Sequence, residues 1–232
     1  MLEVKDIHTY YGSSYVLRGI SLRVEKEEIA CLLGRNGAGK TTTIKSIMGI
    51  LPLEKGSVEF NGQQLRGLRP FKVAKMGVGY VPEDRRIYPD FTVRENLEIV
   101  PHGLGGKTKM SLNEIFDFFP DLKVLEKRLG CQLSGGQLQM LAIARALMGN
   151  PELILLDEPT EGLAPLVVGA LLESIEKLRK KGTSVLLAEQ NARAAIKVSS
   201  KVYILNEGII AFEGTTNEFL ENPDLVKRHL LV

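Results

Sequence analysis

The 232-residue sequence contains no tryptophan, only three histidines and only two cysteines. The cysteines, Cys31 and Cys131, stand far apart, and His8, His102 and His229 are equally scattered. None of these residues has the short spacing of a structural zinc site, and no histidine pair suggests acid–base catalysis. We therefore expect two free thiols and a chemistry that depends on other residue types.

The sequence also lacks long apolar runs and any excess of charge of one sign. No hydrophobic stretch approaches the roughly 18 residues of a membrane-spanning helix. Residues 1 to 6 are already charged and alternate in polarity, so we expect no signal peptide. The net charge of +2 gives no field that would attract nucleic acid or an anionic membrane. We expect a cytoplasmic protein that binds no nucleic acid.

Glycine is concentrated in residues 34 to 41, which read GRNGAGKT. This is the phosphate-loop pattern G-x-x-x-x-G-K-[ST], in which backbone N–H groups and a helix N-terminus surround an anion. Residues 28 to 33 are typical of a buried strand that enters the loop, and residues 41 to 50 have the apolar spacing of a helix that leaves it. The residues expected to bind nucleotide here are Gly34, Arg35, Asn36, Gly37, Ala38, Gly39, Lys40, Thr41 and Thr42.

Two of these side chains have specific roles in the expected site. Lys40 would reach the β- and γ-phosphates of a nucleoside triphosphate, and the Thr41 hydroxyl would be a ligand of Mg²⁺. Asp157 and Glu158 follow the apolar strand predicted at residues 153 to 156. Two carboxylates at such a strand end repel one another, and a cation removes the conflict. We expect Asp157 to hold Mg²⁺ and Glu158 to act as the general base toward water.

A second anion-binding motif is expected at residues 133 to 137, which read LSGGQ and open a helix. Ser134 is a good N-cap, but two glycines weaken a helix by roughly 1 kcal/mol each. This cost suggests that a ligand approaches the backbone of Gly135 and Gly136. Because the chain already has one phosphate loop, one solution is that each chain presents this second motif to the nucleotide of another chain.

The rest of the chain divides around these motifs. Residues 2 to 8 and 15 to 25 alternate like strands of an antiparallel sheet. Strands and helices then alternate, except between about residues 91 and 133, where we expect a small helical subdomain that begins with a capping box at Thr92 and Glu95. Residues 1–90 and 134–232 would form the nucleotide-binding core of a single domain. The tail, residues 217 to 232, is expected to be helical.

Taken together, the three motifs resemble those of an ABC ATPase in order and spacing. The resemblance covers essentially the whole chain and is greatest to the ATPase subunits of branched-chain amino acid importers. The segments that carry this narrower resemblance are residues 10–12, 82–89, 139–147, 161–165 and 189–192. The implied fold is an α/β P-loop NTPase of the ABC ATPase type, with a mostly parallel core sheet, an N-terminal antiparallel β subdomain and a small helical subdomain.

The resemblance also implies the ligands and partners. ATP and Mg²⁺ would be the cofactors, with adenine stacked on Tyr11 and Val16 in the same site. Ser134, Gly135, Gly136 and Gln137 would contact the ATP of a second ATPase subunit, either an identical copy or a related paralogue. Membrane permease subunits would bind through Arg85, Arg86, Tyr88 and Phe91, which places the protein on the inner face of the cell membrane as a peripheral subunit.

Three positions depart from the general pattern of the family. Glu83 stands where most members have a glutamine near Mg²⁺ and the attacking water, and we count it as both a metal ligand and a catalytic residue. Ala164 replaces an aspartate that usually crosses the dimer interface. Gln190 replaces a histidine that usually contacts the γ-phosphate, and it is the third expected catalytic residue beside Glu158. All three changes look typical of the branched-chain subgroup and make slow or partner-dependent hydrolysis plausible.

The sequence leaves other functions open. One alternative is a soluble ABC ATPase that acts in translation or repair, although such proteins usually fuse two units in one chain. A second alternative is a nucleotide-gated binding module with negligible turnover, which Ala164 and Gln190 favour and Glu158 argues against. An ABC ATPase for another transported substrate is the third alternative, because this subunit should never touch the substrate.

Overall fold

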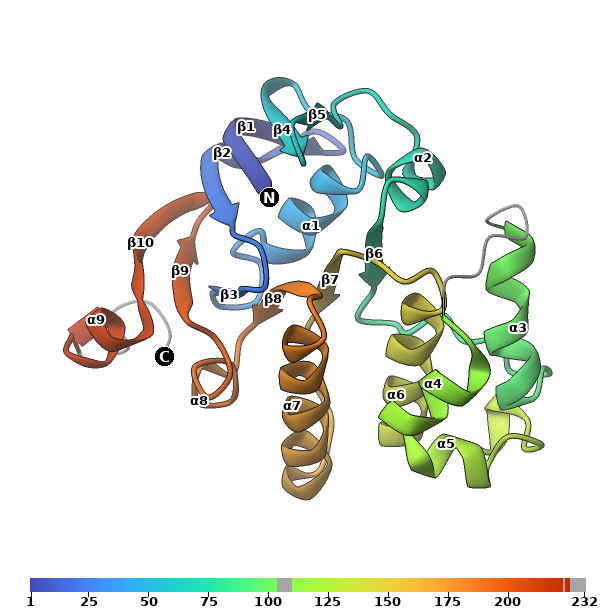
Figure 1. Ribbon diagram of the computed structural model, residues 1–232. Helices are drawn as coiled ribbons and strands as arrows, with labels where there is room; N and C mark the ends of the chain where they lie inside the picture. The colour runs from blue at the N-terminus through green and yellow to red at the C-terminus, as the bar shows by residue number, and fades with distance from the viewer. Residues whose placement is uncertain (104–109, 223, 226–232) are drawn as a thin grey trace.

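The computed structural model of the chain describes residues 1–103, 110–222, 224 and 225. Its central sheet consists of β3 (Ile29–Leu33), β6 (Val78–Val81), β7 (Leu153–Asp157), β8 (Ser184–Glu189), β9 (Lys201–Asn206) and β10 (Ile209–Thr215). The strand order is β10-β9-β3-β8-β7-β6 (Figure 1). Every pair from β9 to β6 is parallel, and β10 pairs with β9 in the antiparallel sense. The expected mostly parallel core sheet is confirmed.

A second sheet is formed near the N-terminus. It contains β1 (Leu2–Tyr11), β2 (Ser14–Val24), β4 (Lys55–Phe60) and β5 (Gln63–Gln64). The order is β2-β1-β4-β5, and all three pairs are antiparallel. Asn61 and Gly62 connect β4 to β5 with φ of 50° and 75°, the left-handed geometry that a two-residue hairpin turn requires. The antiparallel sheet expected from alternating polarity is thus confirmed.

The helices surround the central sheet. They are α1 (Lys40–Ile47), α2 (Pro70–Lys75), α3 (Val93–Gly103), α4 (Leu112–Phe118), α5 (Pro120–Val124), the 3₁₀ turn η1 (Gly130–Gln132), α6 (Gly135–Leu147), α7 (Pro165–Lys180), α8 (Ala192–Ala195) and α9 (Thr216–Leu220). Helix α1 lies between the two sheets, whereas α7 covers the opposite face of the central sheet (Figure 1). In the part of the chain that the structure describes, no helix is long and apolar enough to cross a membrane.

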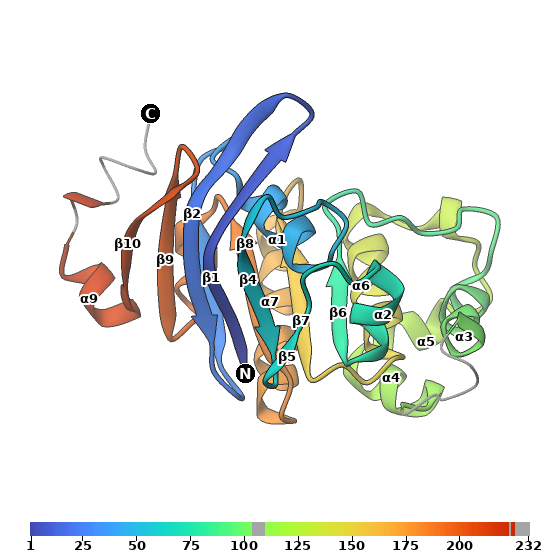
Figure 2. The ribbon, with the colours of Figure 1, turned by 90° about the horizontal axis from the view of Figure 1, so that it is seen from above.

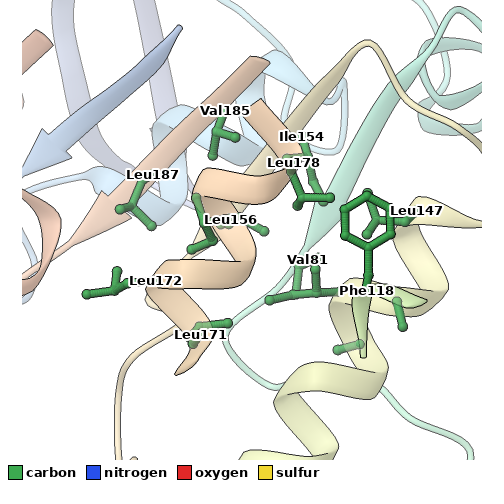
Figure 3. Packing of buried hydrophobic residues seen from close by; sticks show 14 of the residues in the cluster. Val81, Phe118, Leu147, Ile154, Leu156, Leu171, Leu172, Leu178, Val185 and Leu187 are labelled. Carbon is green, nitrogen blue, oxygen red and sulfur yellow. The ribbon is translucent and has the colours of Figure 1, made fainter. Parts of the chain in front are cut away.

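Two hydrophobic clusters lie on the two faces of the central sheet. Along β3, Ile29, Cys31 and Leu33 belong to the cluster that packs against α6 and α7, whereas Ala30 and Leu32 belong to the cluster shared with the antiparallel sheet and α1. This alternation follows from the two-residue period of a strand. Figure 3 shows the first cluster, where side chains of β7 and β8 meet those of α7. The strand ends that carry the candidate site are therefore fixed from both sides.

Helices α3, α4 and α5 form a group beyond the β6 edge of the central sheet (Figure 2). Helices α3 and α5 pack against α6. The predicted capping box is present: Glu95 N–H donates to Thr92 Oγ1 at 3.1 Å, and Thr92 N–H donates to Glu95 Oε2 at 2.7 Å. The division into a core and a helical subdomain at about residues 91–133 stays a prediction.

One local expectation about secondary structure is wrong, and one helix was not predicted. The tail is not one helix from residue 217, because α9 ends at Leu220. Asn222 precedes a proline, which disfavours helical geometry there, and residues 226–232 lie outside the described part of the chain. Helix α2 was not expected at all, since Val73 is the one buried residue of its six and gives no readable period.

Candidate active site

The phosphate loop lies between the carboxyl end of β3 and the start of α1. Gly37 and Gly39 have φ of 80° and 113°, in the left-handed region that favours glycine. A Cβ at Gly34 would lie 2.5 Å from the carbonyl oxygen of Leu205, so close packing against β9 requires glycine there. The loop therefore depends on its glycines both for backbone shape and for its position on the sheet.

Lys40 connects this loop to the end of β7. Its Nζ donates to the carbonyl oxygens of Gly34 at 2.7 Å and Arg35 at 3.0 Å. The same Nζ lies 2.8 Å from Glu158 Oε1, and the two side chains are only 5% and 7% exposed. A buried carboxylate needs such a partner, because desolvating an unpaired charge is costly. The expected phosphate-binding lysine and the expected catalytic base thus form a direct ion pair.

Thr41 and Asp157 form a second contact between the loop and β7. The Thr41 hydroxyl donates to Asp157 Oδ1 at 3.0 Å, while Asp157 Oδ2 is buried without a hydrogen-bond partner among the described residues. Burial raises the pKa of Asp157 to about 6, the Thr41 hydrogen bond opposes this, and nearby Glu158 and Glu83 raise it further. An electron-rich carboxylate oxygen next to a hydroxyl suits a hard divalent cation. Such a cation would offset both the burial of the Asp157 charge and its repulsion by Glu158 and Glu83.

The possible ligands of such a cation are Thr41, Asp157 and the nearby Glu83. The described ranges contain no group of three or more His, Cys, Asp or Glu side chains placed to hold a metal. Mg²⁺ keeps several waters and takes one or two protein ligands together with phosphate oxygens. Thr41 and Asp157 fit this role on their contacts. Glu83 is exposed and lines the same cavity.

Glu158 is held in an unusual backbone conformation. Its φ of 48° places a non-glycine residue in the left-handed region, which costs free energy and persists only where surrounding contacts hold it. Its N–H donates to the Ala188 carbonyl at 2.9 Å, and its Oε2 accepts the Gln190 N–H at 3.0 Å. Gln190 therefore contributes a backbone donor to the expected base, while its side chain is exposed.

These groups line a cavity of about 470 Å³. Its lining residues are Tyr11, Ser14, Val16, Asn36, Gly37, Gly39, Lys40, Thr41, Thr42, Lys45, Glu83, Glu158 and Glu161. Tyr11 stands at its edge with 57% of its surface exposed, and the Lys45 Nζ lies 6.0 Å from its ring centroid. An exposed aromatic ring beside a phosphate loop is suited to stacking on a base. Ala38, within the loop, is buried and does not line the cavity.

The second expected motif lies outside this set of lining residues. Ser134 and Gln137 form a capping box, with Gln137 N–H donating to Ser134 Oγ at 3.4 Å and Ser134 N–H to Gln137 Oε1 at 2.9 Å. A Cβ at Gly136 would lie 2.6 Å from Val167 Cγ1 on α7, so packing alone requires that glycine. A Cβ at Gly135 would meet nothing closer than 3.7 Å. Of the two glycines, only Gly135 is left without a packing reason and has room for a ligand to approach.

A further cavity of about 380 Å³ lies between α2, β6, α3 and α6, with Tyr80, Arg85, Val100 and Arg145 in its lining. Tyr88 and Phe91 lie beside rather than in this lining. They are 46% and 39% exposed, and their ring centroids are 5.2 Å apart. Arg145 connects the two features, because its guanidinium carbon lies 5.5 Å from the Tyr88 ring centroid.

Fold and site together define a P-loop nucleoside triphosphatase: a parallel sheet whose strand ends bring together a phosphate loop, a hydroxyl–carboxylate pair and a second buried carboxylate. The family follows from comparison with known proteins. The ABC transporter family model matches residues 17–161, and the chain belongs to this family of ATP-hydrolysing proteins.

Three relatives are similar along their whole length. A high-affinity branched-chain amino acid transport ATP-binding protein, BraG of Pseudomonas aeruginosa, is 38% identical over 99% of both chains. A probable branched-chain amino acid transport ATP-binding protein, LivF of Archaeoglobus fulgidus, is 35% identical over 98% of this chain and 97% of its own. The lipopolysaccharide export system ATP-binding protein LptB of Haemophilus influenzae is 34% identical over 98% and 95%.

Solved structures agree with the fold. The ADP conformation of MJ1267, an ATP-binding cassette of an ABC transporter, superposes with a TM-score of 0.84 at 29% identity and covers 98% of this chain and 97% of that chain. A dimeric post-hydrolysis structure of the cassette MJ0796 with ADP and Pi gives a TM-score of 0.82 at 25% identity, over 93% and 99%.

Sequence reasoning missed several residues of the site. Ser14, Lys45 and Glu161 line the cavity. Of these, only Glu161 belongs to a segment, residues 161–165, that carries the family resemblance. Glu189 is buried at the end of β8, and its Oε1 accepts the Thr160 N–H at 2.9 Å. A carboxylate directly after the apolar stretch 185–188 was the available signal, parallel to the one that identified Asp157 and Glu158.

Proposed function

We propose that this chain is the ATP-hydrolysing motor subunit of an importer for branched-chain amino acids. The observation that carries the proposal is the 38% identity to the Pseudomonas protein over 99% of both chains. Similarity from end to end includes the surfaces that such a subunit offers to its partners, not only the phosphate loop. Glu83, Ala164 and Gln190 support the same subgroup, because they replace residues that are common elsewhere in the family.

ATP binds in the 470 Å³ cavity. Adenine stacks on Tyr11 beside Val16, and the phosphates accept hydrogen bonds from the loop N–H groups of residues 34–42. Lys40 supplies the main positive charge to the β- and γ-phosphates. Thr41, Asp157 and Glu83 would hold Mg²⁺, which would neutralise charge on the phosphate oxygens.

The Lys40–Glu158 ion pair links binding to catalysis. Lys40 donates to Glu158 at 2.8 Å, and a triphosphate competes for the same ammonium group. When Lys40 turns to phosphate, Glu158 loses its partner and becomes free to accept the proton of the attacking water. The Gln190 N–H keeps the second carboxylate oxygen in place, while the Gln190 side-chain amide donates to the γ-phosphate.

A second ATPase subunit, identical or paralogous, completes the site. Ser134, Gly135, Gly136 and Gln137 begin α6 outside the cavity of their own chain, with room at Gly135 for a ligand to approach. In the dimer, this helix start contacts the ATP of the partner subunit. The dimeric structure of the related cassette MJ0796 supports such an arrangement.

Membrane permease subunits bind at the 380 Å³ cavity and at the exposed rings of Tyr88 and Phe91 beside it. Arg86, which is exposed, adds charge to this surface. The guanidinium of Arg85 is instead engaged by groups of its own chain. Such attachment places the subunit on the cytoplasmic face of the membrane. The contact with the permease lies near the helical region of residues 91–133.

The test is reconstitution with candidate permeases and a binding protein in lipid vesicles. We expect leucine, isoleucine or valine, delivered by the binding protein, to stimulate ATP hydrolysis, and the Glu158→Gln complex to show no stimulation. Stimulation by another solute alone would contradict the substrate class. A lipopolysaccharide export motor is the second candidate, favoured by the 34% identity to LptB.

The remaining alternatives have their own outcomes. A chain that hydrolyses ATP but associates with no permease would instead be a soluble ABC ATPase. A chain that binds ATP without releasing phosphate over hours would be a nucleotide-gated module.

A further inference from the structure

Arg85 lies in a segment of unusual backbone directly after Glu83. Arg85 and Arg86 have φ of 59° and 48°, so two successive non-glycine residues are left-handed. Such residues persist where surrounding contacts hold them. The Arg85 N–H donates to the Pro82 carbonyl at 3.0 Å and closes a turn. The two side chains then differ: Arg86 pairs with Asp84 at 3.0 Å on the surface, whereas Arg85 is directed into the molecule.

The Arg85 side chain joins two other parts of the site. Its Nε donates to Gln139 Oε1 on α6 at 2.8 Å, and its Nη2 donates to the Glu161 carbonyl at 3.3 Å, three residues after Glu158. The Arg85 carbonyl accepts from Arg145 Nη2, also on α6, at 3.2 Å. One residue thus connects the Glu83 segment, the helix of the second motif and the stretch that follows the expected base.

The charge of Arg85 points to a ligand at the same place. Both of its side-chain acceptors are neutral, and within the described residues no carboxylate forms an ion pair with it. Its Nη1 would lie 3.7 Å from a Cβ on Gly135, so the positive charge stands beside the first residue of α6. A positive charge at a helix N-terminus opposes the helix dipole, and an anion bound there reverses this effect.

The Gln139 side chain also indicates that its hydrogen bond with Arg85 serves to position the guanidinium. Its side chain is 2% exposed, and its Nε2 has no hydrogen-bond partner in the described part of the chain. A buried amide with an unpaired donor is costly. An ordinary packing contact would be served better by an apolar residue, whereas Gln139 supplies the acceptor that orients the guanidinium.

We propose that Arg85 is a positioning residue for ATP-driven dimer closure. It fixes the start of α6 and the stretch after Glu158 relative to Glu83, and it adds positive charge where α6 meets the phosphates of the partner subunit's ATP. This inference rests on the proposed dimer site. It predicts that loss of Arg85 weakens closure without weakening the binding of ATP to the single subunit.

The test uses the full chain in a Glu158→Gln background, where ATP accumulates in the closed dimer. Sedimentation measures the ATP-dependent dimer dissociation constant, and a fluorescent ATP analogue measures nucleotide affinity at monomer concentrations. For Arg85→Met we expect the dimer dissociation constant to rise about tenfold, the effect of losing one charge-assisted hydrogen bond, with nucleotide affinity unchanged. Arg85→Lys, which keeps the charge, should recover part of the loss.

Two controls separate positioning from stability. Arg94→Met removes an arginine of α3 that pairs with Glu98 and Glu126 and should leave dimerisation unchanged. Because Arg85 and Gln139 share one interaction, the Arg85→Met, Gln139→Leu double variant should be no weaker than the worse single variant.

Each possible result bears on the proposal. An Arg85→Met variant that melts earlier but dimerises normally would show a merely structural role and overturn it, as would additive effects of the two substitutions. If the Glu158→Gln chain with Arg85 intact forms no ATP-dependent dimer, the dimer site and the role of Arg85 fail together. If the Glu158→Gln chain dimerises equally well with Arg85 and with Arg85→Met, the role of Arg85 is refuted and the dimer site is not.

Discussion

At the scale of single residues, substitutions in the Lys40–Glu158 ion pair should affect stability and activity differently. Lys40→Ala should abolish ATP binding or hydrolysis, because the phosphates lose their main cation. It should also lower the free energy of unfolding by roughly 3 kcal/mol, since Glu158 is left buried without its partner. Adding Glu158→Gln should restore most of the stability and none of the activity. Denaturant unfolding and phosphate release check the two effects, and unchanged affinity and turnover in Lys40→Ala would disprove the phosphate-loop role.

Glu189 should make stability depend on pH. Burial raises the pKa of this carboxyl to about 7, although hydrogen bonds from Thr160 lower it and nearby Glu158 raises it. The folded state therefore keeps a proton that the unfolded chain releases. This contribution is complete below about pH 4.5 and is lost as the pH rises through about 7. Between pH 5 and pH 8, wild type should lose roughly 2–3 kcal/mol more than Glu189→Gln, which cannot ionise.

Denaturant titrations of both proteins at several pH values, without nucleotide or metal, measure this difference. The Glu189→Gln variant keeps an oxygen that accepts the Thr160 N–H, so it should fold. Parallel pH profiles for the two proteins would mean that the Glu189 carboxyl does not titrate in this range.

Tyr11 should contribute to affinity and not to turnover. Replacing its half-exposed ring with alanine should weaken ATP binding by about 1–2 kcal/mol, the order of one lost base stack. GTP should be discriminated no worse than before, because stacking tolerates any base. Equilibrium titration with both nucleotides is the measurement, and an affinity equal to that of wild type would reduce Tyr11 to a packed loop residue.

The site residues that were predicted from the sequence belong to a short sequence pattern or have partners close by in the sequence. The phosphate loop and the Asp157–Glu158 pair are of this kind. Glu189 has the same local signal, a carboxylate after an apolar stretch, but its hydrogen-bond donor Thr160 lies 29 residues away, so the sequence does not show what it contacts. The inward direction of the Arg85 side chain was missed because the sequence of a charged loop does not show which of its side chains point into the protein.

At the scale of secondary structure elements, the two glycines of α6 should behave in opposite ways. Gly136→Ala places a Cβ 2.6 Å from Val167 on α7, and the overpacking should cost roughly 1–2 kcal/mol despite the better helix propensity of alanine. A Val167→Ala substitution in the same chain should recover most of this. Gly135→Ala meets only ordinary contact, so it should be at least as stable as wild type.

The two variants also separate packing from ligand binding. If Gly135 lets phosphate approach the helix backbone, Gly135→Ala in the Glu158→Gln background should weaken ATP-dependent dimerisation while its melting temperature is unchanged. Equal melting temperatures for the two glycine variants would contradict the packing argument at Gly136.

Elements with strong local signals were predicted well. The capping box at Thr92 and the N-cap at Ser134 involve residues within three positions of one another, so the sequence contains the whole interaction. Helix α2 has one buried residue and no such signal. Helix α2 packs against β6, and such tertiary contacts cannot be seen in its local sequence.

At the scale of the whole molecule, the surface formed by Tyr88 and Phe91 should separate hydrolysis from transport. Neither ring lines the nucleotide cavity, so the Tyr88→Ala, Phe91→Ala variant should retain the basal hydrolysis of the isolated subunit. In the assembled transporter, the same change should loosen assembly and lower uptake, since buried aromatic anchors contribute strongly to interfaces. Both activities must be measured in one preparation. If basal hydrolysis collapses while assembly and uptake per ATP stay normal, these residues belong to the catalytic core.

The order of motifs along the chain was enough to predict the fold class, because the resemblance covers the chain from end to end. The sequence did not show how the surface segment after Glu83 relates to the second cavity. The structure places Tyr88 and Phe91 next to that cavity, with Arg145 between the two features. Such relations join residues more than 50 positions apart and depend on how α6 packs.

The alternation of β7 between the two hydrophobic clusters constrains how this protein can vary. Leu153 and Leu155 face one cluster, and Ile154 and Leu156 face the other. Because all four are large and apolar, exchanging one for another changes little beyond local packing. Removing or adding a single residue would exchange the two sets and turn Asp157 away from Thr41. Among natural relatives and in deletion libraries, β7 should therefore vary in composition but keep a fixed length up to its carboxylates.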